Sequence, residues 1–191
     1  KLNGTSKTFF TDGKIESEKN YRMGKEDGKH LSYDYDGTLR MDHNYKDGKQ
    51  VGKQYTFMKG TYELYETVYY NNEGLKDGEY SSIFTFGAPH VLGSYKNGQK
   101  NGRWTEIAES GDTIVIETYL NGKEEGLHVS YSGETGMRTK EYYLKNDRKD
   151  GIYREYDLKN GELKYEATYQ FGRLHGKARQ LVVDNRFDYW E

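Results

Sequence analysis

The chain has 191 residues, of which 33% are hydrophobic and 31% are charged, and its formal net charge at pH 7 is -2. Lysine and glutamate are interspersed without a basic stripe, so the composition excludes the electrostatic pattern of a nucleic-acid binder. The sequence has no cysteine, which excludes disulfides and thiolate metal sites, and no apolar run approaches the ~18 residues of a membrane span.

A glycine recurs at regular spacing along the chain. The spacings are 24, 24, 26, 24, 24, 25 and 25 residues, between Gly4, Gly28, Gly52, Gly78, Gly102, Gly126, Gly151 and Gly176. Seven of these glycines follow a tyrosine by seven or eight residues: Tyr21, Tyr45, Tyr70, Tyr95, Tyr119, Tyr143 and Tyr169. A period of this length predicts a repeat protein. We therefore interpret residues 1–191 as a single repeat domain, with repeats beginning near residues 1, 21, 45, 70, 95, 119, 143 and 169.

Each repeat carries two turn signals. The first lies between the tyrosine and the glycine, as the dipeptides Asp47-Gly48, Asn97-Gly98 and Asn121-Gly122, which favour type I′ hairpin turns. The second follows the glycine by about nine residues, as Asp12-Gly13, Asp36-Gly37, Ser110-Gly111 and Asn160-Gly161. Two turns in a repeat of ~24 residues leave two strands of about six or seven residues each.

Alternation of side chains assigns the faces of these strands. Leu39, Met41, His43 and Tyr45 form an apolar stripe in the second strand of one repeat. Five residues after each glycine stands an apolar or aromatic residue, and we expect this position to pack with that stripe: Phe9, Tyr33, Phe57, Ile83, Ile107, Tyr131, Tyr156 and Leu181. By parity, the residue two after the glycine lies on the opposite face unless a bulge intervenes.

These elements predict an all-β fold: an elongated, single-layer antiparallel meander of about eight stacked β-hairpins of ~24 residues. The last repeat departs from the pattern at Arg186–Trp190, and we expect it to be a cap. The chain begins with Lys1 inside a repeat, so we expect sequence upstream. A removed signal peptide would make the protein extracytoplasmic; otherwise we expect it in the cytoplasm.

The recurring pattern Tyr-x-x-Gly-x-x-x-Gly-x-[Tyr/Trp], followed by Asn/Asp-Gly and a strand rich in Lys and Glu, resembles the MORN-repeat variant of bacterial proteins. It is similar to the proteins grouped with the YwqK-type antitoxins. The resemblance covers essentially the whole chain, and it implies a stack of hairpins that serves as an interaction scaffold, in some members neutralising a toxin. Classical MORN repeats are also linked to membrane lipids and to protein assembly.

The residues indicate no catalytic chemistry. The histidines His30, His43, His90, His128 and His175 show no metal-ligand spacing, and carboxylate pairs such as Glu16/Glu18, Glu124/Glu125 and Glu109/Asp112 are typical of solvated strand faces. We therefore expect neither an enzyme nor a metal site, and no cofactor. Tyrosine and tryptophan recur in binding hot spots, so we predict that the variable position two after the glycine forms an exposed binding ladder, with packing as the alternative: Tyr80, Trp104, His128 and Tyr153.

The sequence thus predicts a non-enzymatic scaffold that binds a protein partner, with an antitoxin or immunity role as the most specific version. The alternative is a cell-surface module that binds glycan or choline-like groups in the cell wall. A membrane-lipid role is weaker, because the chain has no polybasic patch to attract anionic lipids. Open sheet edges also predict edge-to-edge homodimers.

Overall fold

The computed structural model describes the backbone of residues 1–83, 89–182 and 186–190. These residues form β-strands joined by turns, and none of them belongs to a helix long and apolar enough to cross a membrane. The chain divides into two compact units, Lys1–Gln99 and Lys100–Glu191, called here the N-terminal unit and the C-terminal unit.

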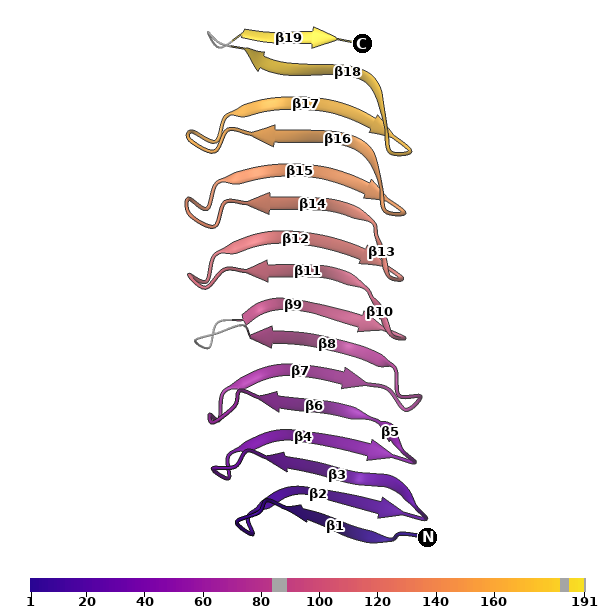
Figure 1. The fold of residues 1–191 in the computed structure, drawn as a ribbon. Helices are drawn as coiled ribbons and strands as arrows, with labels where there is room; N and C mark the ends of the chain where they lie inside the picture. Colours follow the sequence, from indigo (N-terminus) through magenta and orange to yellow (C-terminus); the bar gives the residue numbers. More distant parts are fainter. Residues whose placement is uncertain (84–88, 183–185, 191) are drawn as a thin grey trace. The chain divides into compact units, whose positions relative to one another are not determined.

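In the N-terminal unit, each strand pairs antiparallel with the next one along the chain (Figure 1). The two-residue strand β5 continues the ladder on β4 before β6 begins. The strands are β1 Gly4–Phe9, β2 Ile15–Arg22, β3 Lys25–Tyr33, β4 Leu39–Lys46, β5 Lys49–Gln50, β6 Gly52–Phe57, β7 Leu64–Tyr70, β8 Lys76–Ile83 and β9 Pro89–Lys96. Strand β10, Gln99–Lys100, spans the division between the units.

The C-terminal unit repeats this arrangement from β11 to β19. Its strands are β11 Gly102–Ile107, β12 Thr113–Leu120, β13 Lys123–Glu124, β14 Gly126–Tyr131, β15 Arg138–Lys145, β16 Arg148–Tyr156, β17 Leu163–Gln170, β18 Arg173–Val182 and β19 Arg186–Trp190. Both units are therefore antiparallel meanders of β-hairpins, which confirms the predicted all-β fold.

The turns between tyrosine and glycine have the predicted conformation. Both central residues take positive φ in the three predicted pairs, for example 50° at Asp47 and 85° at Gly48. Positive φ at both positions defines the type I′ turn, whose twist matches that of the flanking strands. The turn signals thus predicted the hairpins correctly.

Each of these turns is also bonded to the preceding repeat. The amide of Asn97, the first turn residue, donates to Asp77 Oδ2 at 3.2 Å, and the amide of Gly98 donates to the carbonyl of Lys76 at 2.7 Å. The acceptor side chain stands immediately before the repeat glycine. The same contact joins Asn3 to Met23, Asp27 to Asp47, Asn101 to Asn121, Glu125 to Asn146 and Asp150 to Phe171. These bonds satisfy turn amides and fix one repeat against the next.

The third repeat lacks this acceptor, because Val51 precedes Gly52. The turn that follows is correspondingly longer and supplies its own acceptor. Asn71 Oδ1 accepts from the amides of Glu73 at 3.1 Å and Leu75 at 2.9 Å. An Asx turn of this kind replaces the contact that the other repeats make with their neighbour.

One repeat boundary differs from the sequence interpretation. Leu144, and not Tyr143, pairs with the repeat glycine Gly126, and its side chain is buried. Tyr143 points to the other face and is 49% exposed. The following turn is Asn146-Asp147, with φ of 50° and 63°, so Asp147 stands where the other type I′ turns have glycine. The absent glycine shifted the alignment by one residue.

The repeat glycines lie at bulges. Lys19 pairs with His30 and Tyr21 pairs with Glu26, so three residues centred on Gly28 lie opposite Asn20 alone. Gly28 has φ of 109°, a conformation that other residues rarely adopt. Because His30 pairs with His43 and Gly28 with Tyr45, the residue two after the glycine lies on the same face as the tyrosines.

The position five after the glycine was predicted to pack with the stripe of Leu39 to Tyr45; Tyr33 does pair with Leu39, but it lies on the face opposite Tyr45. Lys19 pairs with His30 on the tyrosine face, so the adjacent residue Glu18 lies on the opposite face. Tyr33 lies beside Glu18, and burial together with Glu18 raises the pKa of the Tyr33 phenol. Tyr156 lies under the Arg138 guanidinium, 5.8 Å from the ring centroid. Both tyrosines are on the face opposite the tyrosine stripe. In both cases the partner strand has a bulge, and the register shifts between Ser32 and Tyr33 and between Glu155 and Tyr156. The extra residue changes the alternation of faces that the prediction assumed.

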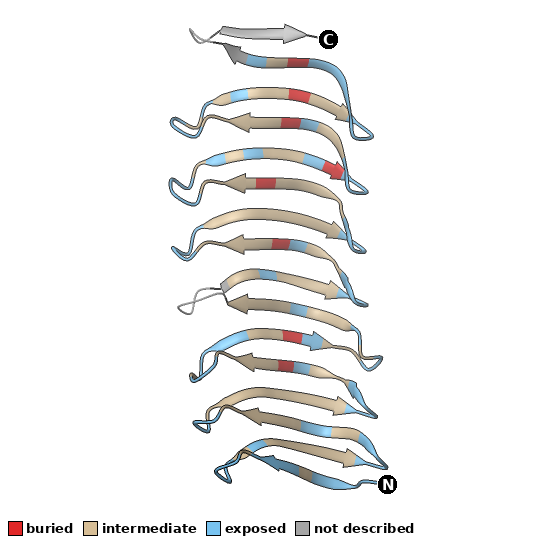
Figure 2. Cartoon of the chain, in the orientation of Figure 1, coloured by how far each residue is buried: buried red, intermediate tan, exposed pale blue. Residues whose placement is uncertain are grey.

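Few of the side chains that the structure describes are buried, and they lie singly along the strands (Figure 2). They are Gln54, Val68, Trp104, Val129, Leu144, Tyr153, Ala167 and Ala178. Opposite the tyrosines in the C-terminal unit, an ionic ladder runs across four strands through Arg138, Glu141, Arg154, Glu166 and Arg179. A networked ladder of half-buried charges stabilises a thin sheet more than isolated surface pairs do.

Candidate functional site

The tyrosine face is built around the repeat glycines. A tyrosine pairs directly with the glycine of its neighbouring strand in Gly4–Tyr21, Gly28–Tyr45, Gly52–Tyr70, Gly78–Tyr95, Gly102–Tyr119 and Gly151–Tyr169. Each of these glycines has a positive φ, from 70° at Gly52 to 132° at Gly78, which residues with a side chain rarely adopt. The residues two before and two after the glycine lie against the tyrosine ring, as Lys100 and Trp104 do at Tyr119.

These two flanking positions, called here the −2 and +2 positions, vary together around the six repeat glycines between the first and the last. Lysine at −2 accompanies tyrosine or tryptophan at +2, glutamate accompanies histidine, and glutamine accompanies glutamine. The pairs are Lys76/Tyr80, Lys100/Trp104, Lys149/Tyr153, Glu26/His30, Glu124/His128 and Gln50/Gln54. Residues that change together in this way are expected to touch.

Contacts within the pairs explain the matching. Lys100 Nζ lies 4.3 Å from the Trp104 ring centroid, and Lys149 Nζ lies 3.8 Å from that of Tyr153. The same ammonium groups lie over the next tyrosine, at 4.6 Å for Tyr119 and 5.0 Å for Tyr169. Cation–π contacts of this kind require an aromatic ring at +2. Burial lowers the pKa of Lys149, as expected for an ammonium group held between rings.

The four residues predicted to form a binding ladder all occupy the +2 position. Trp104 and Tyr153 are only 4% and 7% exposed, so the predicted exposure is wrong for these two, and the packing alternative holds. Tyr80 and His128 are half-buried. Burial raises the pKa of Tyr80 to about 12. Tyr80 belongs to the N-terminal unit and the other three to the C-terminal unit, and a binding role for any of them stays a prediction.

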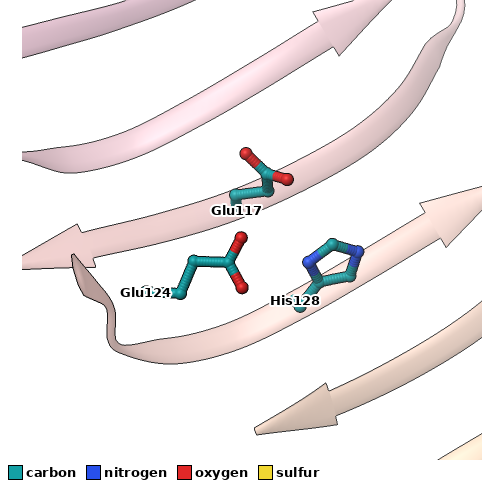
Figure 3. Close-up of side chains that lie close together, drawn as sticks. All are labelled: Glu117, Glu124 and His128. Atoms are coloured by element: carbon teal, nitrogen blue, oxygen red, sulfur yellow. The ribbon is translucent and has the colours of Figure 1, made fainter. Parts of the chain in front are cut away.

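In the C-terminal unit, the tyrosine face brings together Glu117 of β12, Glu124 of β13 and His128 of β14 (Figure 3). One ligand atom from each of these residues lies within 4.8 Å of the other two, and all three side chains are half-buried. The sequence alone did not predict such a cluster. The residues are separated by seven and four positions, and only the hairpin at Asn121-Gly122 and the bulge at Gly126 bring them together.

Hydrogen bonds hold the two carboxylates of this cluster. The Tyr119 hydroxyl donates to Glu117 Oε2 at 2.8 Å and lies 3.2 Å from Glu124 Oε1. Burial and these two glutamates raise the pKa of Tyr119, so its phenol remains a neutral donor. The His128 ring stacks on Tyr142 at 4.4 Å, and its Nε2 lies 3.2 Å from Ser130 Oγ. Its Nδ1 is buried without a hydrogen-bond partner.

The N-terminal unit has an open groove of about 630 Å³ on its tyrosine face. The groove runs from His30 and Lys19 to the loop residues Phe10 and Tyr35, whose rings meet edge to face at 5.3 Å. Tyr35 is 55% exposed, and Tyr62 in the β6–β7 loop is 75% exposed. The two loops are joined by the Gly60 amide, which donates to Asp34 Oδ2 at 2.9 Å.

Fold and face together define a β-hairpin repeat protein. Residues 2–23 and 26–47 match the MORN repeat variant, which confirms this part of the resemblance for the first two repeats. MORN repeats in general are protein- or membrane-interaction modules. A search of curated proteins found no match to the chain.

Proposed function

We propose that the chain is a non-catalytic scaffold that binds a partner protein through the groove of the N-terminal unit. The main observation that supports this proposal is the groove itself, which is open to solvent and has the paired rings of Phe10 and Tyr35 at one end. An exposed aromatic pocket with polar walls accepts an apolar anchor residue of a partner, the arrangement that concentrates binding energy in protein interfaces. Strands β1 to β4, which build this groove, lie in the two repeats that match the MORN repeat variant. Because MORN repeats are interaction modules, this match supports the proposal.

The finer proposal is an antitoxin or immunity role, in which the partner is a toxin. Its support is the resemblance to YwqK-type proteins. Coexpression with the product of a neighbouring gene tests it, because an antitoxin restores growth that the toxin alone arrests. Growth arrest that persists with every neighbouring gene product would contradict this role.

The groove is tested with the immobilised chain and a double variant, Phe10→Ala with Tyr35→Ala, which removes the two rings that line it. We expect a partner retained by the wild-type chain to be lost by the double variant. The matched control is Tyr143→Ala, which removes a tyrosine that is 49% exposed in the C-terminal unit and should leave binding intact. Equal retention by the double variant would contradict the groove. Binding to glycan arrays or liposomes without a protein partner would favour the cell-wall or lipid alternative.

A further inference from the structure

The cluster of Glu117, Glu124 and His128 has a counterpart in the N-terminal unit that differs in one residue. Glu26 and His30 occupy the same −2 and +2 positions, and Lys19 stands where the cluster has Glu117. Lys19 Nζ lies 3.2 Å from Glu26 Oε1. The His30 Nδ1, like that of His128, is buried without a partner. In this counterpart the chain supplies its own cation.

The third repeat has a neutral version of the same arrangement. His43, Gln50 and Gln54 occupy the three positions, and His43 Nδ1 lies 3.3 Å from Gln50 Nε2. Besides histidine, the counterpart in the N-terminal unit therefore has one lysine and one glutamate, and the third repeat has two glutamines. The cluster in the C-terminal unit has two glutamates. The last set alone brings two carboxylates together, and neither of these glutamates forms an ion pair with another residue that the structure describes.

The nearby lysine is engaged elsewhere. Lys100 Nζ lies over the rings of Trp104 and Tyr119, at 4.3 and 4.6 Å from their centroids. Tyr119 binds one oxygen of each carboxylate, which leaves Glu117 Oε1 and Glu124 Oε2 available. Together with the unpartnered Nδ1 of His128, the cluster offers two carboxylate oxygens and one imidazole nitrogen.

We propose that Glu117, Glu124 and His128 form a binding site for a divalent transition-metal ion, with Zn²⁺ as the best-matched ion. Three protein ligands of the nitrogen and oxygen type, with positions left for water, suit Zn²⁺, whereas Mg²⁺ and Ca²⁺ prefer oxygen ligands alone. Ligand atoms about 2.1 Å from a tetrahedral ion lie about 3.4 Å apart. The side chains start within 4.8 Å of one another, so small rotations complete the site. Tyr119 then acts as an outer hydrogen-bond donor that orients both carboxylates.

The chain itself provides the matched variants. Glu117→Lys places an ammonium group where Lys19 stands in the counterpart, and Glu117→Gln removes the charge at nearly constant shape. Lys19→Glu converts the counterpart, with Glu26 and His30, into a second copy of the cluster. His43→Gln and His175→Ala are controls, because both histidines lie outside the cluster.

The test is calorimetric titration of the metal-free full chain with ZnCl₂, with MgCl₂ and CaCl₂ in parallel and circular dichroism as the check of folding. We expect one equivalent of Zn²⁺ in the wild-type chain and in both controls, and affinity weakened at least about 100-fold in both Glu117 variants. Lys19→Glu should bind a second equivalent. Absence of saturable binding in the wild-type chain, or unchanged binding in folded Glu117→Lys, would overturn the site. A folded Lys19→Glu variant that gains no second equivalent would overturn the equivalence on which the argument rests.

Discussion

The buried side chain of Gln54 is predicted to hold the bulge of the third repeat together. It is 1% exposed, and its amide bonds only to backbone groups. Its Oε1 accepts from the amide of Asn44 at 2.6 Å, and its Nε2 donates to the carbonyl of Val51 at 2.7 Å. Longer contacts reach the carbonyls of Asn44 and Gly52, at 3.2 and 3.3 Å.

Replacing Gln54 by leucine keeps the volume but removes these bonds. Leaving the Asn44 amide and the Val51 carbonyl buried without partners costs about 1–3 kcal/mol for each group. Burial of the leucine side chain returns about 1.5–3 kcal/mol. We therefore expect Gln54→Leu to lower the free energy of unfolding by about 1–2 kcal/mol, the middle of these ranges.

The assay is urea unfolding followed by circular dichroism. The control is Gln50→Leu, which removes only the contacts of Gln50 Nε2 with His43 and Tyr45, at 3.3 and 3.4 Å, and should change stability by less than about 0.5 kcal/mol. The reasoning would be refuted if Gln54→Leu were as stable as the wild-type chain, since the amide would then contribute nothing beyond its volume.

Three further predictions follow from turns and titration. Met23 and Phe171 occupy the first central position of type I′ turns at φ of 52°, and they are 68% and 67% exposed. Met23→Asn and Phe171→Asn should each raise the free energy of unfolding by about 0.5–1 kcal/mol, because asparagine tolerates this conformation better. Thermal unfolding of either variant at a lower temperature than the wild-type chain would contradict this. Asp77→Ala removes the acceptor for the Asn97 amide and should lower the free energy of unfolding by about 0.5–1.5 kcal/mol. The control Val51→Ala removes no such bond. Equal losses of stability in urea unfolding would argue against the contact between repeats. Burial lowers the pKa of His43, so the folded chain binds fewer protons than the unfolded chain. The stability that neutral His43 contributes is therefore present above the ordinary histidine pKa of about 6.5 and is lost as the pH falls through and below it. His43→Gln should flatten the unfolding profile between about pH 7 and 5, and an unchanged slope would show that His43 does not contribute.

Turn chemistry made the hairpins predictable. Asp-Gly and Asn-Gly carry a local conformational preference, so Asp47-Gly48 and Asn97-Gly98 could be placed without knowledge of the fold. The period of the glycines placed the repeats, but the pairing of each tyrosine with a glycine of the neighbouring strand appeared only in the structure. Asn146-Asp147 was missed for the same local reason, because its second residue lacks the glycine that marks the other turns.

The faces were harder to predict, because bulges add residues that no local signal marks. The shift near Tyr33 pairs it with Leu39 but separates it from the face of Met41 and Tyr45, and the bulge at the glycine sets the +2 position beside the tyrosines. The cluster of Glu117, Glu124 and His128 depends on both the hairpin and the bulge. A comparison of −2 with +2 residues across repeats would have detected its Glu/His pair, although it would not have placed Glu117.

The most direct claim about the −2 and +2 positions is that the lysine at −2 touches the aromatic ring at +2 across the glycine bulge. A double-mutant cycle on Lys149→Met and Tyr153→Leu tests it most directly, with Lys149→Met and Tyr143→Leu as the control cycle on opposite faces. The 3.8 Å contact between Lys149 Nζ and the Tyr153 ring predicts a coupling free energy of about 0.5–2 kcal/mol, and the control cycle should give less than about 0.5 kcal/mol. Equal coupling in the two cycles would contradict the claim.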